Sequence, residues 1–238
     1  MTGTAAVQSV DAVLAALKRR GSRTNVEGMK RYGISSTLMF GVSASELRRM
    51  AKEIGRNHAL ALELWETGWY EARMLAAFIA DPDAITATQM DRWARDFDNW
   101  AITDTVCFSL FDRTRHAWRK VDAWSGRSAE FVRRAGFALL ASMALHDRHG
   151  SEAEYRKRLA LVRKYAFDDR NFVKKGVSWA LHSIGCRSRA LHADALRLAG
   201  ELAASADPAE RWVGRDAVRK LKSAATMKRV NRNAEGRK

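Results

Sequence analysis

The chain has 238 residues, of which 42 are Lys or Arg and 27 are Asp or Glu, giving a formal net charge of +15. Such an excess of cations indicates a nucleic-acid partner, or else another anionic surface or a merely solubilising charge. The longest apolar run, 135–145, is much shorter than the roughly 20 residues of a membrane span. No signal-peptide core follows Met1, and Cys107 and Cys186 lie in helical patterns, which argues against a disulfide framework. We expect a soluble, cytoplasmic protein.

In chain order, the apolar spacing predicts helices almost throughout and no strand. Ser43 and Glu46 open a run that Gly55 ends, and residues 22–40 are expected to be an irregular segment. Each of the two prolines, Pro82 and Pro208, follows an Asp and is expected at the first position of a helix. The remaining predicted helices cover 9–20, 58–67, 69–80, 86–96, 98–112, 128–146, 151–165, 169–184, 188–205 and 207–223. We expect one domain over 1–223 and a basic, disordered tail over 224–238.

A ten-residue pattern recurs with a period of about 40. Its copies begin at Phe131, Phe172 and Trp212, each with Val in second place and Arg or Lys in fourth, and fainter copies begin at Tyr70 and Phe97. Helical repeats of this length are typical of HEAT-like solenoids, in which each unit buries its apolar face against its neighbours. The sequence therefore predicts an all-α solenoid of HEAT-like repeats with a concave basic groove.

The fourth place of the pattern defines a predicted ladder along the groove, formed by Arg73, Trp100, Arg134, Lys175 and Arg215. Asp104 lies four residues after Trp100 and therefore on the same helix face, and Trp179 takes the equivalent eighth place in a later copy. A carboxylate surrounded by cations and aromatic rings indicates a functional site, in which the rings could hold a cationic base and the cations could hold phosphates. Core packing of the tryptophans and a capping or solvated role for Asp104 are the alternatives.

Residues 99–104, Phe131 to Ala135, Phe172 to Leu181 and Arg215 to Val218 resemble the DNA alkylation repair family of HEAT-like-repeat DNA glycosylases over about residues 40 to 222. The resemblance implies monofunctional excision of cationic N3- and N7-alkylated purines from double-stranded DNA, without metal or organic cofactor. We expect a monomer. It also implies that the lesion need not enter a pocket. Ala101 departs from the family pattern, in which an acidic residue often follows the first Trp.

The resemblance assigns catalysis to Asp104, lesion or sugar contact to Trp100 and Trp179, and a phosphate contact to Arg134. The ladder adds Lys175, Arg73 and Arg215 as phosphate contacts. A carboxylate beside the deoxyribose would stabilise the positive charge that develops as the glycosidic bond breaks, and would position the attacking water. Tyr32 is a further candidate for contact with the duplex.

Other classes of function stay open. The pair His146 and His149 lacks further ligands at metal-binding spacing, so we predict no metal site. A noncatalytic module for duplex or branched DNA would keep the ladder without needing Asp104, and a protein-binding scaffold would expose apolar grooves. DNA binding would associate the cytoplasmic protein with the nucleoid.

Overall fold

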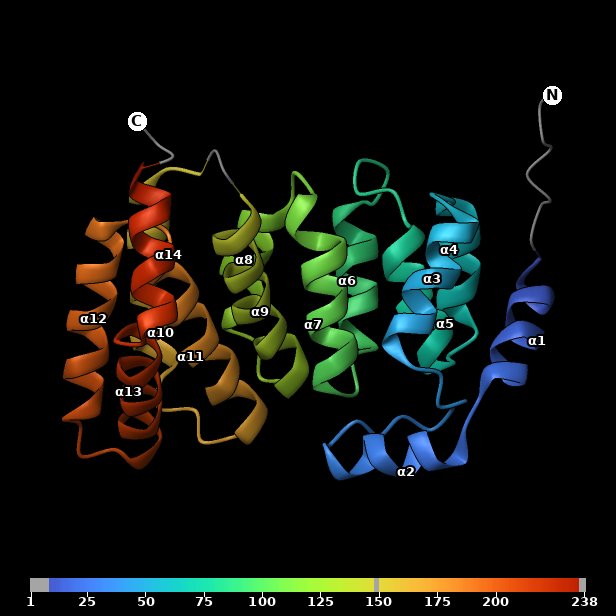
Figure 1. Ribbon diagram of the computed structural model, residues 1–238, viewed down its shortest axis with the longest axis horizontal. Coiled ribbons are helices and arrows are strands. Elements are labelled where there is room, and N and C mark those ends of the chain that lie inside the picture. The colour runs from blue at the N-terminus through green and yellow to red at the C-terminus, as the bar shows by residue number, and fades with distance from the viewer. Residues whose placement is uncertain (1–8, 148–149, 236–238) are drawn as a thin grey trace. The chain divides into compact units, whose positions relative to one another are not determined.

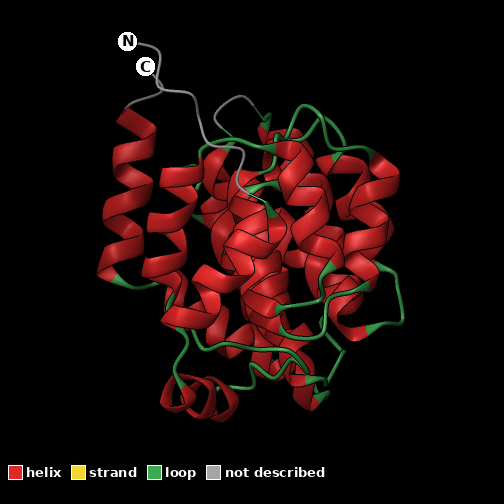
Figure 2. Cartoon of the chain, turned by 90° about the vertical axis from the view of Figure 1, so that its right-hand side faces the viewer, coloured by secondary structure: helices red, strands yellow, loops and turns green. Residues whose placement is uncertain are grey.

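The computed structural model describes residues 9–147 and 150–235, and within these ranges every regular element is a helix (Figures 1 and 2). The chain divides into two compact units, Met1–Leu110 and Phe111–Lys238. In a repeat array each helix pair contacts mainly its neighbours, so such a division is compatible with one domain. A single domain over 1–223 stays a prediction.

The first unit holds seven helices: α1 (Val10–Arg20), α2 (Arg23–Arg31), α3 (Ala44–Ile54), α4 (His58–Glu66), α5 (Tyr70–Ile79), α6 (Ala87–Arg95) and α7 (Trp100–Ser109). Helix α5 is the centre of this unit, because α1, α3, α4 and α7 all pack against it. The indole rings of Trp65 and Trp93 stack with centroids 4.0 Å apart, and both side chains are fully buried. This aromatic pair joins α4 to α6.

The second unit begins with the short 3-10 helix η1 (Phe111–Arg113) and continues with α8 (Ala117–Ser125), α9 (Glu130–His146), α10 (Glu152–Tyr165), α11 (Asn171–Gly185), α12 (Arg189–Ala203), α13 (Pro208–Leu221) and α14 (Ala224–Glu235). Helices α9, α11 and α13 follow one another as packed neighbours, and α8 and α12 pack on α9 and α13 (Figure 1). The rings of Phe131 and Phe172 lie 5.6 Å apart, and the Ser178 hydroxyl donates to Asp216 over 2.5 Å. These contacts join α9 to α11 and α11 to α13 near the repeat spacing read from the sequence.

Two glycines allow the helix pairs to approach closely. A Cβ atom at Gly136 would lie 2.5 Å from the backbone nitrogen of Ser125, and one at Gly214 would lie 2.1 Å from that of Ala203. Contacts this short essentially never occur between real Cβ and backbone atoms. Side-chain bulk is therefore excluded where α8 meets α9 and where α12 meets α13.

Glu71 fixes the segment before α3. Its side chain is fully buried, and its two carboxylate oxygens accept hydrogen bonds from the backbone nitrogens of Phe40, Gly41 and Val42. Gly41 has a positive φ of 83°, a conformation that glycine adopts without strain. A buried carboxylate that would otherwise be costly is thus satisfied by the loop that it orders.

The helices differ from the sequence prediction in four places. Helices α2 and α8 form where no helix was predicted, and Pro82 lies in a turn, whereas Pro208 does open a helix that Asp207 caps. Residues 224–235 form α14, although we predicted disorder from 224 to 238. Thr226 and Val230 are buried one turn apart, and Asn233 donates to the carbonyl of Cys186. These three residues hold α14 although its sequence lacks the apolar period that the prediction required. Residues 236–238 lie outside the described range.

Candidate functional site

Helix α7 presents the two residues at the centre of the predicted site. Trp100 is its first residue and Asp104 lies one turn later, and both side chains are partly exposed. Residues four apart share a helix face, so the indole and the carboxylate lie on the same side of α7. The cap of α7 is Asn99, whose side-chain oxygen accepts from the backbone nitrogens of Ala101 and Ile102. Asn99, and not Asp104, therefore caps α7.

The helix start corrects the repeat register in this copy. Phe97 precedes α7 by three residues and is buried, in edge contact with Trp65 at 6.2 Å between ring centroids. Counted from the first helical residue, the fifth place of α7 is Asp104, and the fifth places of α9 and α11 are Arg134 and Lys175. The carboxylate, and not Trp100, thus takes the cationic place of the later repeats.

Arg73 does not have the placement predicted for a phosphate contact. Its guanidinium lies over the Trp65 ring at 5.2 Å, donates to the carbonyls of Trp65 and Asp96, and is 3.7 Å from the Asp96 carboxylate. Only 19% of the side chain is exposed. These contacts join α5 to the ends of α4 and α6, so Arg73 packs the first unit together.

Arg134 was also predicted to contact a phosphate, and it too is held inside the protein. The side chain is 6% exposed and its guanidinium donates to the carbonyl oxygen of Phe172, which lies in the first turn of α11. A guanidinium held on a buried carbonyl links α9 to α11 and is not presented to a phosphate. The sequence pattern correctly places Arg134 on α9, but it does not predict that the side chain is buried.

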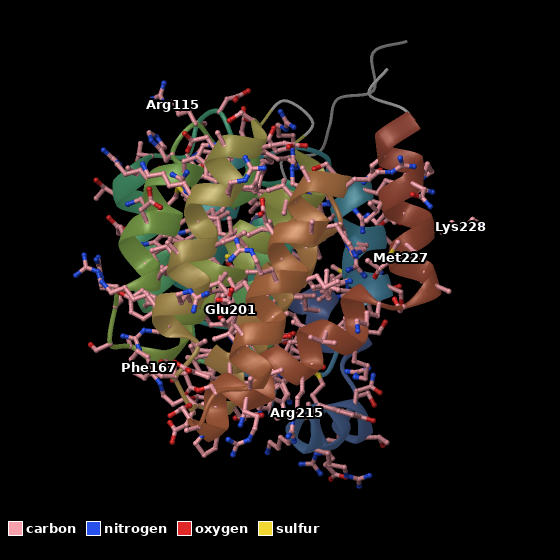
Figure 3. The ribbon with its side chains drawn as sticks, turned by 90° about the vertical axis from the view of Figure 1, so that its left-hand side faces the viewer. Arg115, Phe167, Glu201, Arg215, Met227 and Lys228 are labelled. Atoms are coloured by element: carbon pink, nitrogen blue, oxygen red, sulfur yellow. The ribbon has the colours of Figure 1, made fainter. Side chains whose placement is uncertain are left out.

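Three of the predicted residues in the second unit do face solvent. Lys175 is exposed and Trp179, one turn later on α11, is half-buried. Arg215 on the neighbouring α13 is exposed and is seen in Figure 3. Neither Lys175 nor Arg215 forms an ion pair with another described residue. An unpaired, solvated cation is the form in which Lys and Arg meet DNA phosphates.

The sequence prediction missed two further features near these residues. On α13, a hollow of about 500 Å³ is lined by Arg211, Trp212, Arg215 and Arg219, among others. In the first unit, Trp100 lines a second hollow of about 500 Å³ beneath α2, and its indole nitrogen donates to the carbonyl of Tyr32 over 2.8 Å. The spacing of cations along 211–219 could have indicated the first hollow. The second depends on tertiary packing and has no sequence signal.

Among the described residues there is no group of three or more side chains that could hold a metal ion. His146 instead pairs through Nδ1 with Asp112 at 2.5 Å, and burial raises the pKa of that carboxyl group. His149, the other histidine of the predicted pair, lies outside the described residues. No described helix is long and apolar enough to cross a membrane.

The sequence profile of the DNA alkylation repair enzymes matches residues 13–221. The chain belongs to this family. No curated protein matches the sequence of this family member. A solved structure described as a new family of proteins related to the HEAT-like repeat DNA glycosylases, with affinity for branched DNA structures, is similar to it with a TM-score of 0.74 and 22% identity. The similarity covers 89% of this chain and 94% of that one.

The comparisons and the helices together confirm the predicted all-α fold of HEAT-like repeats. Membership of the DNA alkylation repair enzymes also agrees with the cationic surface of the chain. One concave face that carries Trp100 and Lys175, with Asp104 and Trp179 beside them, stays a prediction.

Proposed function

We propose that this member of the DNA alkylation repair enzymes excises cationic N3- and N7-alkylated purines from double-stranded DNA by hydrolysis of the N-glycosidic bond. The observation that carries the proposal is the placement of Asp104. It is partly exposed and lies one turn from Trp100 on α7, whose cap is Asn99. It is a carboxylate in the place where later repeats carry Arg134 and Lys175, and a negative charge there would weaken the binding of DNA phosphates.

Hydrolysis of the glycosidic bond of an alkylated purine requires few catalytic groups. An alkylated purine already bears the positive charge that makes it a leaving group, so the base needs no general acid. The remaining barrier is positive charge on the deoxyribose, which Asp104 would stabilise while it positions or deprotonates water. Trp100 and Trp179 would contact the cationic lesion or its sugar, with a cation–π attraction of roughly 0.5–2 kcal/mol. Lys175 and Arg215 would hold phosphates.

The proposal is tested by Asp104→Asn, which keeps the side-chain shape and removes the charge. We expect release of 7-methylguanine and 3-methyladenine to fall on the order of 10²–10³-fold, as for the loss of one preorganised electrostatic group. Duplex affinity should be unchanged or tighter. Glu63→Gln, which neutralises an exposed carboxylate on α4, is the control for net charge and should excise like the wild type. An active Asp104→Asn protein would reject this site.

A second candidate is noncatalytic binding to branched DNA. It is favoured by the description of the structurally similar protein, which names an affinity for branched DNA structures. Under this alternative a four-way junction would bind more tightly than a duplex of the same length, and no base would be released. Asp104→Asn would then tighten binding without any catalytic effect.

A further inference from the structure

The hollow on α13 follows one face of that helix. Its volume of about 500 Å³ lies within the range of roughly 300–1,000 Å³ found for small-molecule pockets. The residues that line it recur three or four positions apart on α13, which places them on a single helix face. They are Pro208, Arg211, Trp212, Arg215, Asp216 and Arg219. We call this surface the α13 stripe.

The α13 stripe is cationic. Its arginines occupy every fourth position from 211 to 219, so successive guanidinium groups are attached about 6 Å apart along the helix axis. Arg215 forms no ion pair with another described residue. A regular row of cations favours an occupant with regularly spaced negative charges, which is a nucleic-acid strand rather than a single phosphate.

The one acid that lines the stripe is balanced by its own contacts. The Asp216 side chain is mostly buried. Its carboxylate accepts hydrogen bonds from the side chains of Ser178, Arg219 and Lys220. Because this negative charge is paired with cations of α13, it does not oppose the approach of a phosphate to Arg215.

Trp212 places an aromatic ring among these cations. Its indole is half-buried and lines the stripe, and Nζ of Lys174 on α11 lies 5.3 Å from the ring centroid. A duplex offers phosphates to such a surface, but its base faces are covered by neighbouring base pairs. An unpaired base exposes the face that stacks on an aromatic side chain. A positive surface with aromatic side chains is how proteins bind single strands without sequence preference.

We propose that the α13 stripe binds an unpaired segment of DNA, with one base against Trp212 and neighbouring phosphates on Arg215 and Arg219. The site goes beyond the proposed excision from duplex DNA and does not depend on it, because it requires only that the bound DNA carries a single strand. Such strands occur at overhangs, gaps and branch points. The inference therefore assigns to α13 a preference for partly single-stranded DNA.

The experiment compares three DNAs that share one duplex, each titrated with the full chain in fluorescence anisotropy. The first is blunt, the second carries a short thymidine overhang, and the third carries the same overhang built from abasic residues, which keeps the phosphates and removes the bases. The wild type should bind the thymidine overhang about five- to 150-fold more tightly than the abasic overhang, the effect of one stacked base.

Two aromatic residues of the second unit provide matched variants. Trp212→Leu should bind the thymidine and abasic overhangs equally, and wild-type affinity for the blunt duplex would show that this variant is folded. Phe167→Leu is the control, because Phe167 is 53% exposed between α10 and α11 and lies apart from Arg215 in Figure 3. It should keep the wild-type ratio of affinities.

A crosslink in the wild type gives a measurement that does not depend on the folding of a variant. With 5-iodouracil in place of one thymine of the overhang, irradiation should attach the DNA within residues 208–219, as mapped by peptide mass spectrometry. Crosslinks found only elsewhere would overturn the inference. Equal binding of the two overhangs by the wild type would do the same, as would a base-dependent preference that survives in Trp212→Leu or is lost in Phe167→Leu.

Failure of this inference is distinguishable from failure of the proposed function. Release of alkylated bases from the blunt duplex, without a base-dependent preference for the overhang, removes the single-strand site alone. A preference that Trp212→Leu abolishes, without release of bases, removes the glycosylase proposal alone. A protein that binds none of the three DNAs would overturn both.

Discussion

At the scale of single residues, Asn99 and Thr103 stabilise the first turn of α7, and the neighbouring Asp104 is the proposed catalytic residue. Asn99 is fully buried and completes the first turn, while Thr103 is buried and donates to the Asn99 carbonyl. Asp104 comes directly after Thr103 and is partly exposed. Because Asn99 and Thr103 supply the cap and the buried turn, Asp104→Asn leaves both of these in place.

The exposed cations of the second unit should carry the salt dependence of DNA binding. Each phosphate neutralised contributes about −0.9 to the slope of log affinity against log salt. Lys175→Ala should therefore make that slope less steep by about this amount. Lys157→Ala, which removes an exposed cation on α10, should leave the slope unchanged. Equal slopes for wild type and Lys175→Ala in filter-binding titrations would remove Lys175 from the interface.

The sequence predicts which helix carries each candidate side chain but not whether its charge reaches solvent. Arg134 and Lys175 hold the same place in α9 and α11, yet one donates to a buried carbonyl and the other is exposed. That difference depends on where the backbone of the next helix lies. Asp104 and Trp179 were found because their spacing is local, whereas the hollow under α2 depends on four helices that are distant in sequence.

At the scale of helices, close approach within a pair limits what the sequence can vary. Gly136→Ala would place a methyl group 2.5 Å from the Ser125 nitrogen, so α8 and α9 would have to separate. Overpacking of this kind costs about 1–3 kcal/mol, and we expect the free energy of unfolding in urea to fall by that amount. Gly200→Ala, in open space on α12, should instead raise it by up to ~1 kcal/mol. Stability equal to wild type in Gly136→Ala would contradict the packing.

The docking of α14 should depend on pH. The imidazole of His182 on α11 contacts the hydroxyl of Thr226 over 2.9 Å, and burial, Lys220 and Arg229 lower the pKa of His182. Because the unfolded chain then binds more protons, stability should decrease as the pH falls below about 6.5. His182→Asn should flatten this dependence in thermal melts between about pH 7 and 5. An unchanged dependence would assign the effect to other groups.

Elements with an apolar period were predicted to within a few residues, and those without one were missed. The predicted run 151–165 corresponds to α10 at Glu152–Tyr165. Helix α2 buries no residue, so it has no apolar stripe to read. Helix α14 is held by Thr226, Val230 and Asn233, two of which are polar. Tertiary hydrogen bonds add to the burial of Val230 there, and apolar periodicity cannot predict them.

At the scale of the whole molecule, the net charge of +15 and the family match agree on a DNA partner. A cationic repeat protein could bind DNA without reacting with it. Among the residues proposed for the interface, only Asp104 carries a negative charge, which DNA binding by itself does not require. Release of alkylated bases is therefore the measurement that distinguishes a glycosylase from a DNA-binding module.

The most direct test is to incubate the wild-type protein with methylated duplex DNA and measure the bases released over time. We predict free 3-methyladenine and 7-methylguanine well above the spontaneous release in a sample without protein, with abasic sites left in the duplex. Release indistinguishable from that sample, under conditions where gel retardation shows the DNA to be fully bound, would contradict the proposed activity.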